Sequence, residues 1–332
     1  MKISRFSHIC IALNVYALMQ YLLYHSEDVI MNKTRYFLGS GIPKVIADNI
    51  PNSVYFDTYR KSGLDLFVRR FNKLFLAFFS KIKYPELKSA EIYAQDHQYI
   101  ASCLIGKQSY TLLSDSQQFF SIQMNPGQVE WENINKSNKS LSGRIEKILY
   151  GQLSVFKFGS SSQCKKVLLT KENKSILFDK LAYEIDSFEE LWAMSSEKKR
   201  FFICSCFGVE YKDIDLLQNI DVVLLTQPLC GDGVLTEQEH LDVYQQVIDN
   251  YLNMTVMIKP HPRDTIDYKR YFADCVVFDK PIPMEMLALL GANVKIAATL
   301  FSSSVYCLGD SVRVDWYGTT MHHKLLSFYG KL

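Results

Sequence analysis

The fold is decided by residues 222–263, VVLLTQPLCGDGVLTEQEHLDVYQQVIDNYLNMTVMIKPHPR. The apolar run at 222–226 predicts a buried strand, and 255–258 predicts a second one. Between them, residues 237–251 carry apolar side chains at helical spacing. A strand, a helix and a strand in this order predict one unit of a mainly parallel sheet covered by helices.

The same alternation extends through the rest of the chain. In the second half we expect strands at 201–206, 275–278 and 294–299, and a helix at 284–290. In the first half we expect strands at 8–13, 35–39, 53–56, 91–94 and 110–113, and helices at 15–24 and 66–82. A polar stretch at 186–196 separates the halves, so we expect an α/β protein with Rossmann-like domains at 1–190 and 191–332 and a cleft between them.

Composition fits a globular protein and excludes several other classes. Apolar residues make up 48% of the chain and charged residues 22%, which is not a disordered balance. The net charge of +2 gives no reason to expect a nucleic-acid partner. The eight cysteines form no CxxC pair, so we expect buried thiols in a reducing compartment.

The N-terminal apolar stretch resembles a signal sequence but is interrupted by polar residues, His8, Asn14 and Gln20. It is also shorter than a membrane-spanning helix. We therefore expect a strand and a helix there, and a cytoplasmic protein. Basic residues around the 66–82 segment, among them Arg69 and Lys73, indicate a solvated helix face or a contact with anionic lipid.

Common catalytic motifs are absent from the sequence. It has no GxGxxG after the first strand, no GxxxxGK[ST] and no GxSxG. It also has no HExxH and no His/Cys cluster, so no metal site is expected.

Unusual polar residues follow three strands of the second half, where ligands bind in open α/β sheets. The first group is Gly231-Asp232-Gly233, in which Asp232 is a turn former or a catalytic acid. The second is Lys259-Pro260-His261-Pro262-Arg263, where two prolines fix the backbone around one histidine between two cations. This box suits a phosphate or a proton donor.

The third group is Ser302-Ser303-Ser304, directly after a strand. Its hydroxyls and N–H groups predict an anion site if a helix starts there, or an ordinary helix cap. Glu285 precedes it at the start of a predicted helix. That carboxylate either accepts both hydroxyls of a ribose or interacts with the helix dipole.

Together these residues resemble glycosyltransferase family 52, the bacterial lipooligosaccharide sialyltransferases. The resemblance covers residues 225–308. It rests, in the family's order, on the Asp232 loop, residues 259–263 (the KPHPR box), Glu285 and residues 302–304 (the serine box). It implies a GT-B fold, catalysis without a metal or other cofactor, and CMP-sialic acid as donor. By resemblance, His261 is the acid or phosphate stabiliser, and Asp232 the general base.

The resemblance also implies a donor-binding set. Ser302 and Ser303 hold the CMP phosphate and Glu285 holds the ribose. Asp115 is the acid kept from a motif that commonly reads as an acidic pair followed by Gly, here Leu113-Ser114-Asp115-Ser116, and it is a second candidate for the base or a sugar contact. The full set of expected donor-binding residues is Gly231, Lys259, Pro260, Arg263, Glu285, Ser302, Ser303, Ser304 and Asp115.

The expected partners are a nucleotide-sugar donor and a glycan or lipid-linked glycan acceptor, such as a terminal galactose of a lipopolysaccharide, O-antigen or capsule. Contact with the inner membrane and a homodimer are further expectations. Three alternatives stay open: an α-glucosyltransferase that uses UDP-glucose, a catalytically idle nucleotide-sugar-binding protein, and a transferase that uses CDP-polyols.

Overall fold

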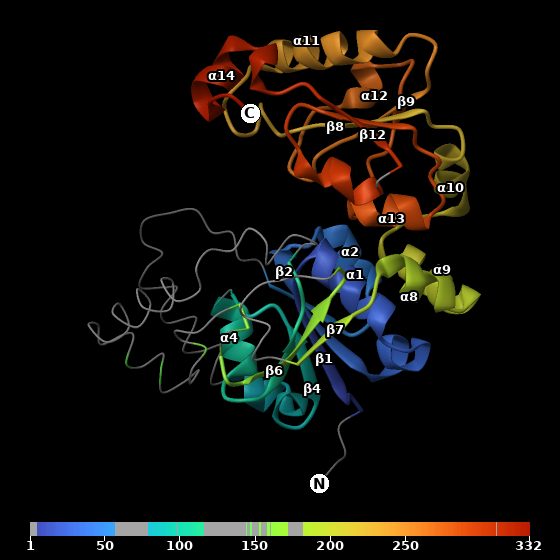
Figure 1. Ribbon diagram of the computed structural model, residues 1–332. Helices are drawn as coiled ribbons and strands as arrows, with labels where there is room; N and C mark the ends of the chain where they lie inside the picture. The colour runs from blue at the N-terminus through green and yellow to red at the C-terminus, as the bar shows by residue number, and fades with distance from the viewer. Residues whose placement is uncertain are drawn as a thin grey trace. The chain divides into compact units, whose positions relative to one another are not determined.

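The computed structural model describes residues 5–56, 79–97, 99–115, 144, 147, 153, 158–159, 161–171, 182–309 and 311–332. The chain divides into two compact units, Met1–Cys206 and Phe207–Leu332. Each unit contains one parallel sheet with helices (Figure 1). The α/β fold expected from the alternation of strands and helices is therefore confirmed.

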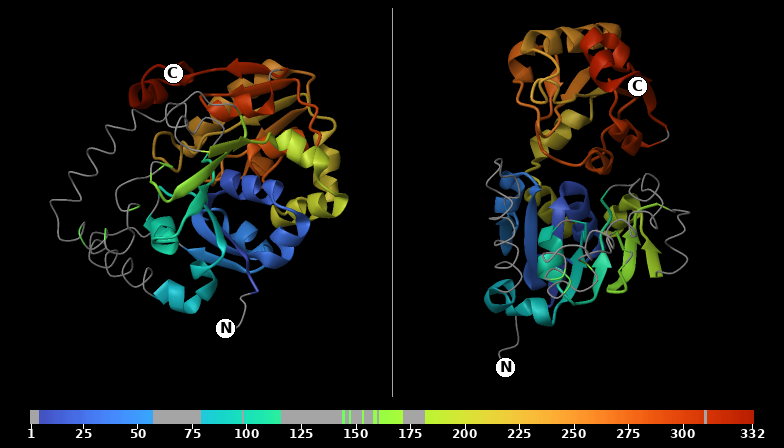
Figure 2. Two further views of the ribbon diagram at one scale, coloured as in Figure 1. Left: turned by 60° about the horizontal axis from the view of Figure 1, so that its bottom comes forward. Right: turned by 90° about the vertical axis from the view of Figure 1, so that its left-hand side faces the viewer.

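The first unit has a seven-stranded sheet in the order β3-β2-β1-β4-β5-β6-β7. Figure 2 shows this sheet extending from the blue strands of the N-terminal part to the yellow-green β7. The strands are β1 (His8–Asn14), β2 (Thr34–Gly41), β3 (Ser53–Phe56), β4 (Glu91–Ala94), β5 (Tyr110–Leu112), β6 (Cys164–Leu169) and β7 (Ala182–Ile185). The longer helical elements are α1 (Val15–Tyr24), α2 (Lys44–Asn49), α4 (Tyr99–Ile105), α8 (Phe188–Met194) and α9 (Glu197–Cys206).

The N-terminal segment adopts the strand and helix that its sequence predicts. β1 is buried over its central residues, and α1 begins directly after Asn14, whose side chain accepts from the Ala17 N–H and caps the helix. Eight of the ten residues of α1 are buried, so this apolar helix is part of the core. No helix in the described ranges has both the length and the apolar character needed to cross a membrane.

The second unit has a five-stranded sheet in the order β10-β9-β8-β11-β12. Its strands are β8 (Val222–Leu225), β9 (Val256–Lys259), β10 (Val276–Val277), β11 (Ile296–Thr299) and β12 (Arg313–Trp316). Its α-helices are α10 (Tyr211–Leu217), α11 (Glu237–Ile248), α12 (Tyr268–Tyr271), α13 (Met284–Leu289) and α14 (His323–Tyr329). In Figure 1, α11 and α14 cover one face of this sheet and α13 lies on the other.

The core of the second unit forms between β8, β9, β11 and the apolar side of α11. The helix contributes Leu241, Tyr244 and Val247, all buried, and its Thr236–Glu239 capping box fixes where it begins. The buried area comes from the same apolar spacing that predicted the helix, and burial of such side chains is the main stabilising contribution.

The predicted strand at 201–206 is wrong, because these residues belong to helix α9. The Ser196 hydroxyl accepts from the Lys199 N–H at the start of that helix. The Lys199 ammonium donates to the Leu23 carbonyl, and Arg200 donates to the carbonyls of Trp192 and Ala193. A six-residue apolar run fits a strand or a buried helix equally well, and these contacts decide for the helix.

Strands β6, β7 and β12 were missed by the sequence-based expectations. The predicted helix at 66–82 lies mostly outside the described residues, as do Arg69 and Lys73.

Candidate active site

The second sheet has a topological switch point between β8 and β11. The chain runs from β8 through β9 to β10 on one side, and then crosses to β11 and β12 on the other. In open α/β sheets ligands bind at the carboxyl ends of the two strands at such a point. The Asp232 loop follows β8, the serine box follows β11, and the KPHPR box follows β9, which pairs directly with β8.

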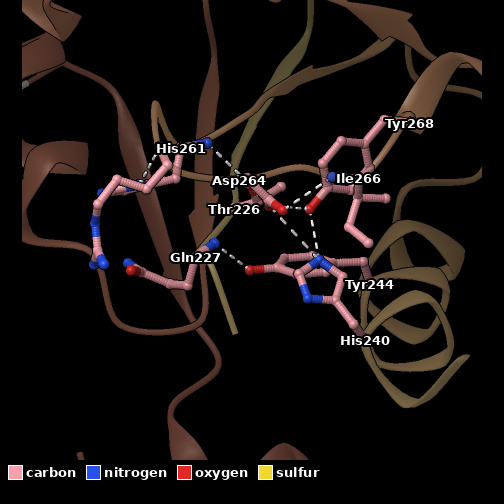
Figure 3. Close-up of polar contacts among 9 residues, drawn as sticks. Thr226, Gln227, His240, Tyr244, His261, Asp264, Ile266 and Tyr268 are labelled. Atoms are coloured by element: carbon pink, nitrogen blue, oxygen red, sulfur yellow. Dashed lines mark hydrogen bonds and ion pairs between the residues drawn. The ribbon is translucent and has the colours of Figure 1, made fainter. Parts of the chain in front are cut away.

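Hydrogen bonds of the backbone and of the ring hold His261 at this edge (Figure 3). Its backbone N–H donates to Thr226 Oγ1 at 3.1 Å, and its ring Nδ1 accepts from the Arg263 N–H at 3.1 Å. Burial, and then the Arg263 cation, lower the pKa of His261 from its usual 6.5. The ring is therefore neutral at pH 7, and because Nδ1 is an acceptor, the proton is on Nε2.

Asp232 and Arg263 form an ion pair that joins the loops after β8 and β9. Arg263 Nη1 lies 2.8 Å from Asp232 Oδ1, and the two side chains are 63% and 31% exposed. Gly233 has a φ of 72°, which a glycine adopts without strain. A Cβ on Gly231 would lie 3.7 Å from the Arg263 carbonyl oxygen, so this loop passes close to the KPHPR box. The expected base is thus paired with one of the two expected cations.

Lys259 is the last residue of β9, and Pro260 connects it to His261. The Lys259 ammonium is buried and donates to the Lys280 carbonyl at 2.8 Å. Burial lowers its pKa to about 8. The ammonium therefore stabilises the segment after β10, and a contact between Lys259 and the donor stays a prediction, as it does for the half-buried Pro260.

The serine box begins with a threonine contact like that of His261. The Ser302 N–H donates to Thr299 Oγ1 at 3.0 Å, and Thr299 is fully buried at the end of β11. The following helix, Ser303–Leu308, is a short 3₁₀ helix. Ser303 is exposed and Ser302 and Ser304 are half-buried. The box therefore offers hydroxyl donors at a turn that a buried threonine fixes to the sheet.

Glu285 is the second residue of α13, and it is buried. Helix α13 packs against the 3₁₀ helix of the serine box. The helix that carries Glu285 is thus brought against the serine box, although 17 residues separate Glu285 from Ser302 in the sequence.

The first sheet also has a switch point, between β1 and β4. Asp115 follows β5, next to β4, and its Oδ1 accepts from Asn14 Nδ2 at 2.6 Å and from Gln95 Nε2. Gln95 is oriented in turn by the Leu13 N–H, which donates to its Oε1 at 2.6 Å. The Asp115 side chain is 39% exposed, so two amides hold a carboxylate that water still reaches.

An imidazole lies beside this carboxylate. His97 Nε2 is 4.0 Å from Asp115 Oδ1, and its ring stacks on Phe158 with centroids 5.3 Å apart. Asp96 next to it is fully buried and accepts from the Tyr110 hydroxyl at 2.6 Å and from the N–H groups of Phe158 and Gly159. Asp96 therefore has a structural role, whereas the Asp115 carboxylate is accessible to water.

Several residues of these sites were missed by the sequence-based expectations, namely Asn14, Gln95, His97, Thr226, Asp264 and Thr299. Asn14, Gln95, Thr226 and Thr299 end or directly follow apolar runs that were predicted as strands. That position at the carboxyl end of a parallel strand was the available signal.

A fold of two units, each built on a parallel sheet with polar side chains at a switch point, defines the GT-B class of glycosyltransferase. The GT-B domain of the Photobacterium damselae sialyltransferase matches with a TM-score of 0.53 and 11% identity over 92% of this chain and 89% of that one. The 2,6-sialyltransferase of Photobacterium sp. JT-ISH-224, solved with CMP and lactose, matches with a TM-score of 0.59 and 12% identity over 92% of this chain and 70% of that one.

The chain belongs to glycosyltransferase family 52, whose profile matches residues 51–325. A Haemophilus influenzae protein described as uncharacterized is 30% identical over 279 residues, which are 84% of this chain and 85% of that protein. The family and the GT-B fold expected from the sequence motifs are thus confirmed.

Proposed function

We propose that the protein is an inverting sialyltransferase that moves sialic acid from CMP-sialic acid to a terminal galactose. One observation carries this proposal. Three segments follow strands of one sheet: His261 follows β9, the helix of Glu285 follows β10 and the serine box follows β11. The carboxyl edge of this sheet therefore offers a proton donor, hydroxyl donors and a carboxylate suited to ribose hydroxyls.

The donor's phosphate would lie between His261 and the serine box. When the bond between the sugar carbon and the phosphate oxygen breaks, negative charge collects on the phosphate. The Nε2–H of His261 and the hydroxyls of Ser302 and Ser303 stabilise that charge. These groups act without a metal ion, so the reaction requires none in this proposal.

Asp232 is the base in this mechanism. It takes the proton of the acceptor hydroxyl while that oxygen forms a bond to the sugar carbon on the face opposite the departing phosphate. Its ion pair with Arg263, at 2.8 Å, links donor binding to the basicity of Asp232. Arg263 is mostly exposed, and a donor phosphate that attracts its guanidinium removes the cation from Asp232 and frees the carboxylate for the proton.

Asp115 and its amide partners would bind sugar hydroxyls, which donate to carboxylates. A galactose acceptor is supported by the lactose bound to the Photobacterium sp. JT-ISH-224 enzyme. We extend the proposal to an α-2,3 linkage and to lipopolysaccharide, O-antigen or capsule glycans, reached by a homodimer at the cytoplasmic face of the inner membrane.

A donor screen tests the proposal. Thermal unfolding is measured with CMP, CMP-sialic acid and UDP-glucose, because a ligand at about 100 times its Kd stabilises a protein by about 2.7 kcal/mol. We expect CMP and CMP-sialic acid to raise the midpoint and UDP-glucose to leave it unchanged, and we expect sialic acid transfer to lactose. Stabilisation by UDP-glucose alone would instead indicate a glucosyltransferase. CMP binding without transfer to any acceptor would indicate an idle binding protein.

A chelator tests the absence of a metal. We expect EDTA to leave the transfer rate unchanged within about 2-fold, because no step of the mechanism uses a Lewis acid. A loss that added Mg²⁺ restores would refute this part of the proposal.

A further inference from the structure

A buried carboxylate lies directly behind the KPHPR box. The Asp264 side chain is 1% exposed. Its Oδ2 accepts from Tyr268 Oη at 2.6 Å and from Thr226 Oγ1 at 3.1 Å, and its Oδ1 accepts from the Ile266 N–H at 3.3 Å. Figure 3 shows Asp264 between Thr226 and Tyr268. Three donors make this acid a fixed point of the loop.

The carboxylate determines which way the Thr226 hydroxyl points. Thr226 has one hydroxyl proton, and it donates that proton to Asp264. Its lone pairs then remain for the His261 N–H, 3.1 Å away. Without Asp264 the hydroxyl proton is free to point toward the His261 N–H, where two donors would face each other.

His240 completes the chain from helix α11. Its Nε2 is 2.6 Å from Tyr268 Oη, and since Tyr268 donates to Asp264, the tyrosine oxygen accepts from the Nε2–H. The His240 ring is fully buried, and within the described ranges its Nδ1 has no hydrogen-bond partner. A second ring proton would have no acceptor there, so His240 stays neutral and remains a donor through Nε2.

We propose that Asp264, Tyr268 and His240 are positioning residues for His261. The chain of donors runs from His240 to Tyr268 to Asp264, and Thr226 links that carboxylate to the His261 backbone. None of the three is required to touch the donor. Their effect passes through the placement of the imidazole, so the inference rests on the role proposed for His261. The prolines on both sides of His261 limit its backbone dihedral angles, and the Thr226 contact ties its N–H to the residue that directly follows β8.

Amide exchange tests the positioning without any substrate. Protein labelled with ¹⁵N at its seven histidines gives one backbone signal for each, and His261→Ala identifies the signal of His261. We expect Tyr268→Phe to speed solvent exchange of the His261 amide at least about 10-fold, the scale of one lost hydrogen bond. Unchanged exchange in a folded Tyr268→Phe protein would overturn the proposal, whatever reaction the protein catalyses.

Tyr271→Phe is the matched control. Tyr271 belongs to the same helix, is 42% exposed and donates to Glu237 Oε1 at 2.8 Å, outside the chain that ends at His261. We expect this variant to leave both the His261 amide and the transfer rate unchanged.

A double-mutant cycle then tests whether the effect on catalysis passes through His261. We expect Tyr268→Phe to lower kcat about 10-fold with little change in the KM for the donor. In the His261→Ala background the same substitution should cause no further loss. A full additional 10-fold loss there would show that Tyr268 acts by another route and would overturn the proposal.

A second pair of variants serves if Tyr268→Phe does not fold. Thr226→Val removes the hydroxyl at nearly constant volume, and Thr226→Ser restores it. We expect fast exchange of the His261 amide in the first variant and wild-type exchange in the second. Equal exchange in both would contradict the proposal.

Discussion

The two switch points of this protein differ in the hydrogen-bonding groups that they present. At the carboxyl edge of the second sheet, the His261 imidazole, the serine hydroxyls and the Arg263 guanidinium are donors, and the exposed Asp232 carboxylate among them is paired with that guanidinium. At that of the first sheet, amide donors from Asn14 and Gln95 are used to hold an acceptor, the Asp115 carboxylate. A donor-rich edge suits a phosphate, and an exposed carboxylate suits a sugar hydroxyl. In the proposed function, the same topology serves a donor phosphate in one unit and an acceptor sugar in the other.

The largest effect should come from the donor-rich edge. We expect His261→Ala to lower kcat/KM for transfer by about 10²–10⁴, the range for a positioned proton-transfer group. Among the residues that the structure describes, the variant loses one hydrogen bond of the ring, that from the Arg263 N–H, so the circular dichroism spectrum should be unchanged. Turnover near that of the wild type would remove His261 from the mechanism.

The comparison is sharpened by exchanging the two exposed acids for amides. We expect Asp232→Asn to lower kcat about 10²-fold or more, because the base is lost. Asp115→Asn should raise the KM for the acceptor about 10-fold with a smaller change in kcat, because a sugar contact is weakened. The reverse pattern in steady-state kinetics would assign the base to Asp115 and leave Asp232 as the partner of Arg263.

A smaller effect is expected at the serine box. Ser303→Ala should weaken CMP binding about 10-fold, as expected for one hydrogen bond to a charged group, and calorimetry would measure it. Ser205→Ala is the control, since Ser205 is also exposed but donates to the Phe202 carbonyl in helix α9. Equal affinity in the Ser303→Ala variant and the wild type would exclude this hydroxyl from the anion site.

A separate effect concerns stability instead of activity, at the amino end of the first sheet and away from Asp115. His25 is buried, and burial lowers its pKa to about 3 from 6.5. Below pH 6.5 the unfolded chain binds a proton that the folded chain does not, so the free energy of unfolding decreases as the pH is lowered. At pH 5 the loss is about 2 kcal/mol relative to pH 7.5.

His25→Phe tests this assignment. The phenyl ring keeps the contacts with Tyr21 and Tyr93 and cannot be protonated. Urea unfolding at pH 7.5 and pH 5 should therefore show a smaller difference in the variant than in the wild type. An equal difference would assign the pH dependence to other groups, such as His8 or His240, whose pKa values burial also lowers.

Much of the candidate site could be predicted because its residues directly follow apolar strands. Short motifs contain His261, Ser302 and Asp232. The prolines and glycines next to His261 and Asp232 also allow the local backbone conformation to be predicted from the sequence. Thr226, Asp264 and Tyr268 could not be assigned in the same way, since their role depends on which strands are neighbours. The 201–206 run failed for a similar reason, because its helix depends on contacts with Leu23, Trp192 and Ala193.

By itself the sequence determined the alternation of strands and helices, the family, and the residues at the strand ends, since periodicity and local motifs act over a few residues. Only the tertiary structure decided the strand order, and with it both switch points. It also paired Asp232 with Arg263, set Asn14 and Gln95 around Asp115, and connected His240 to His261 through a buried carboxylate. These contacts join segments tens of residues apart, and only the packing of the sheets brings them within hydrogen-bond distance.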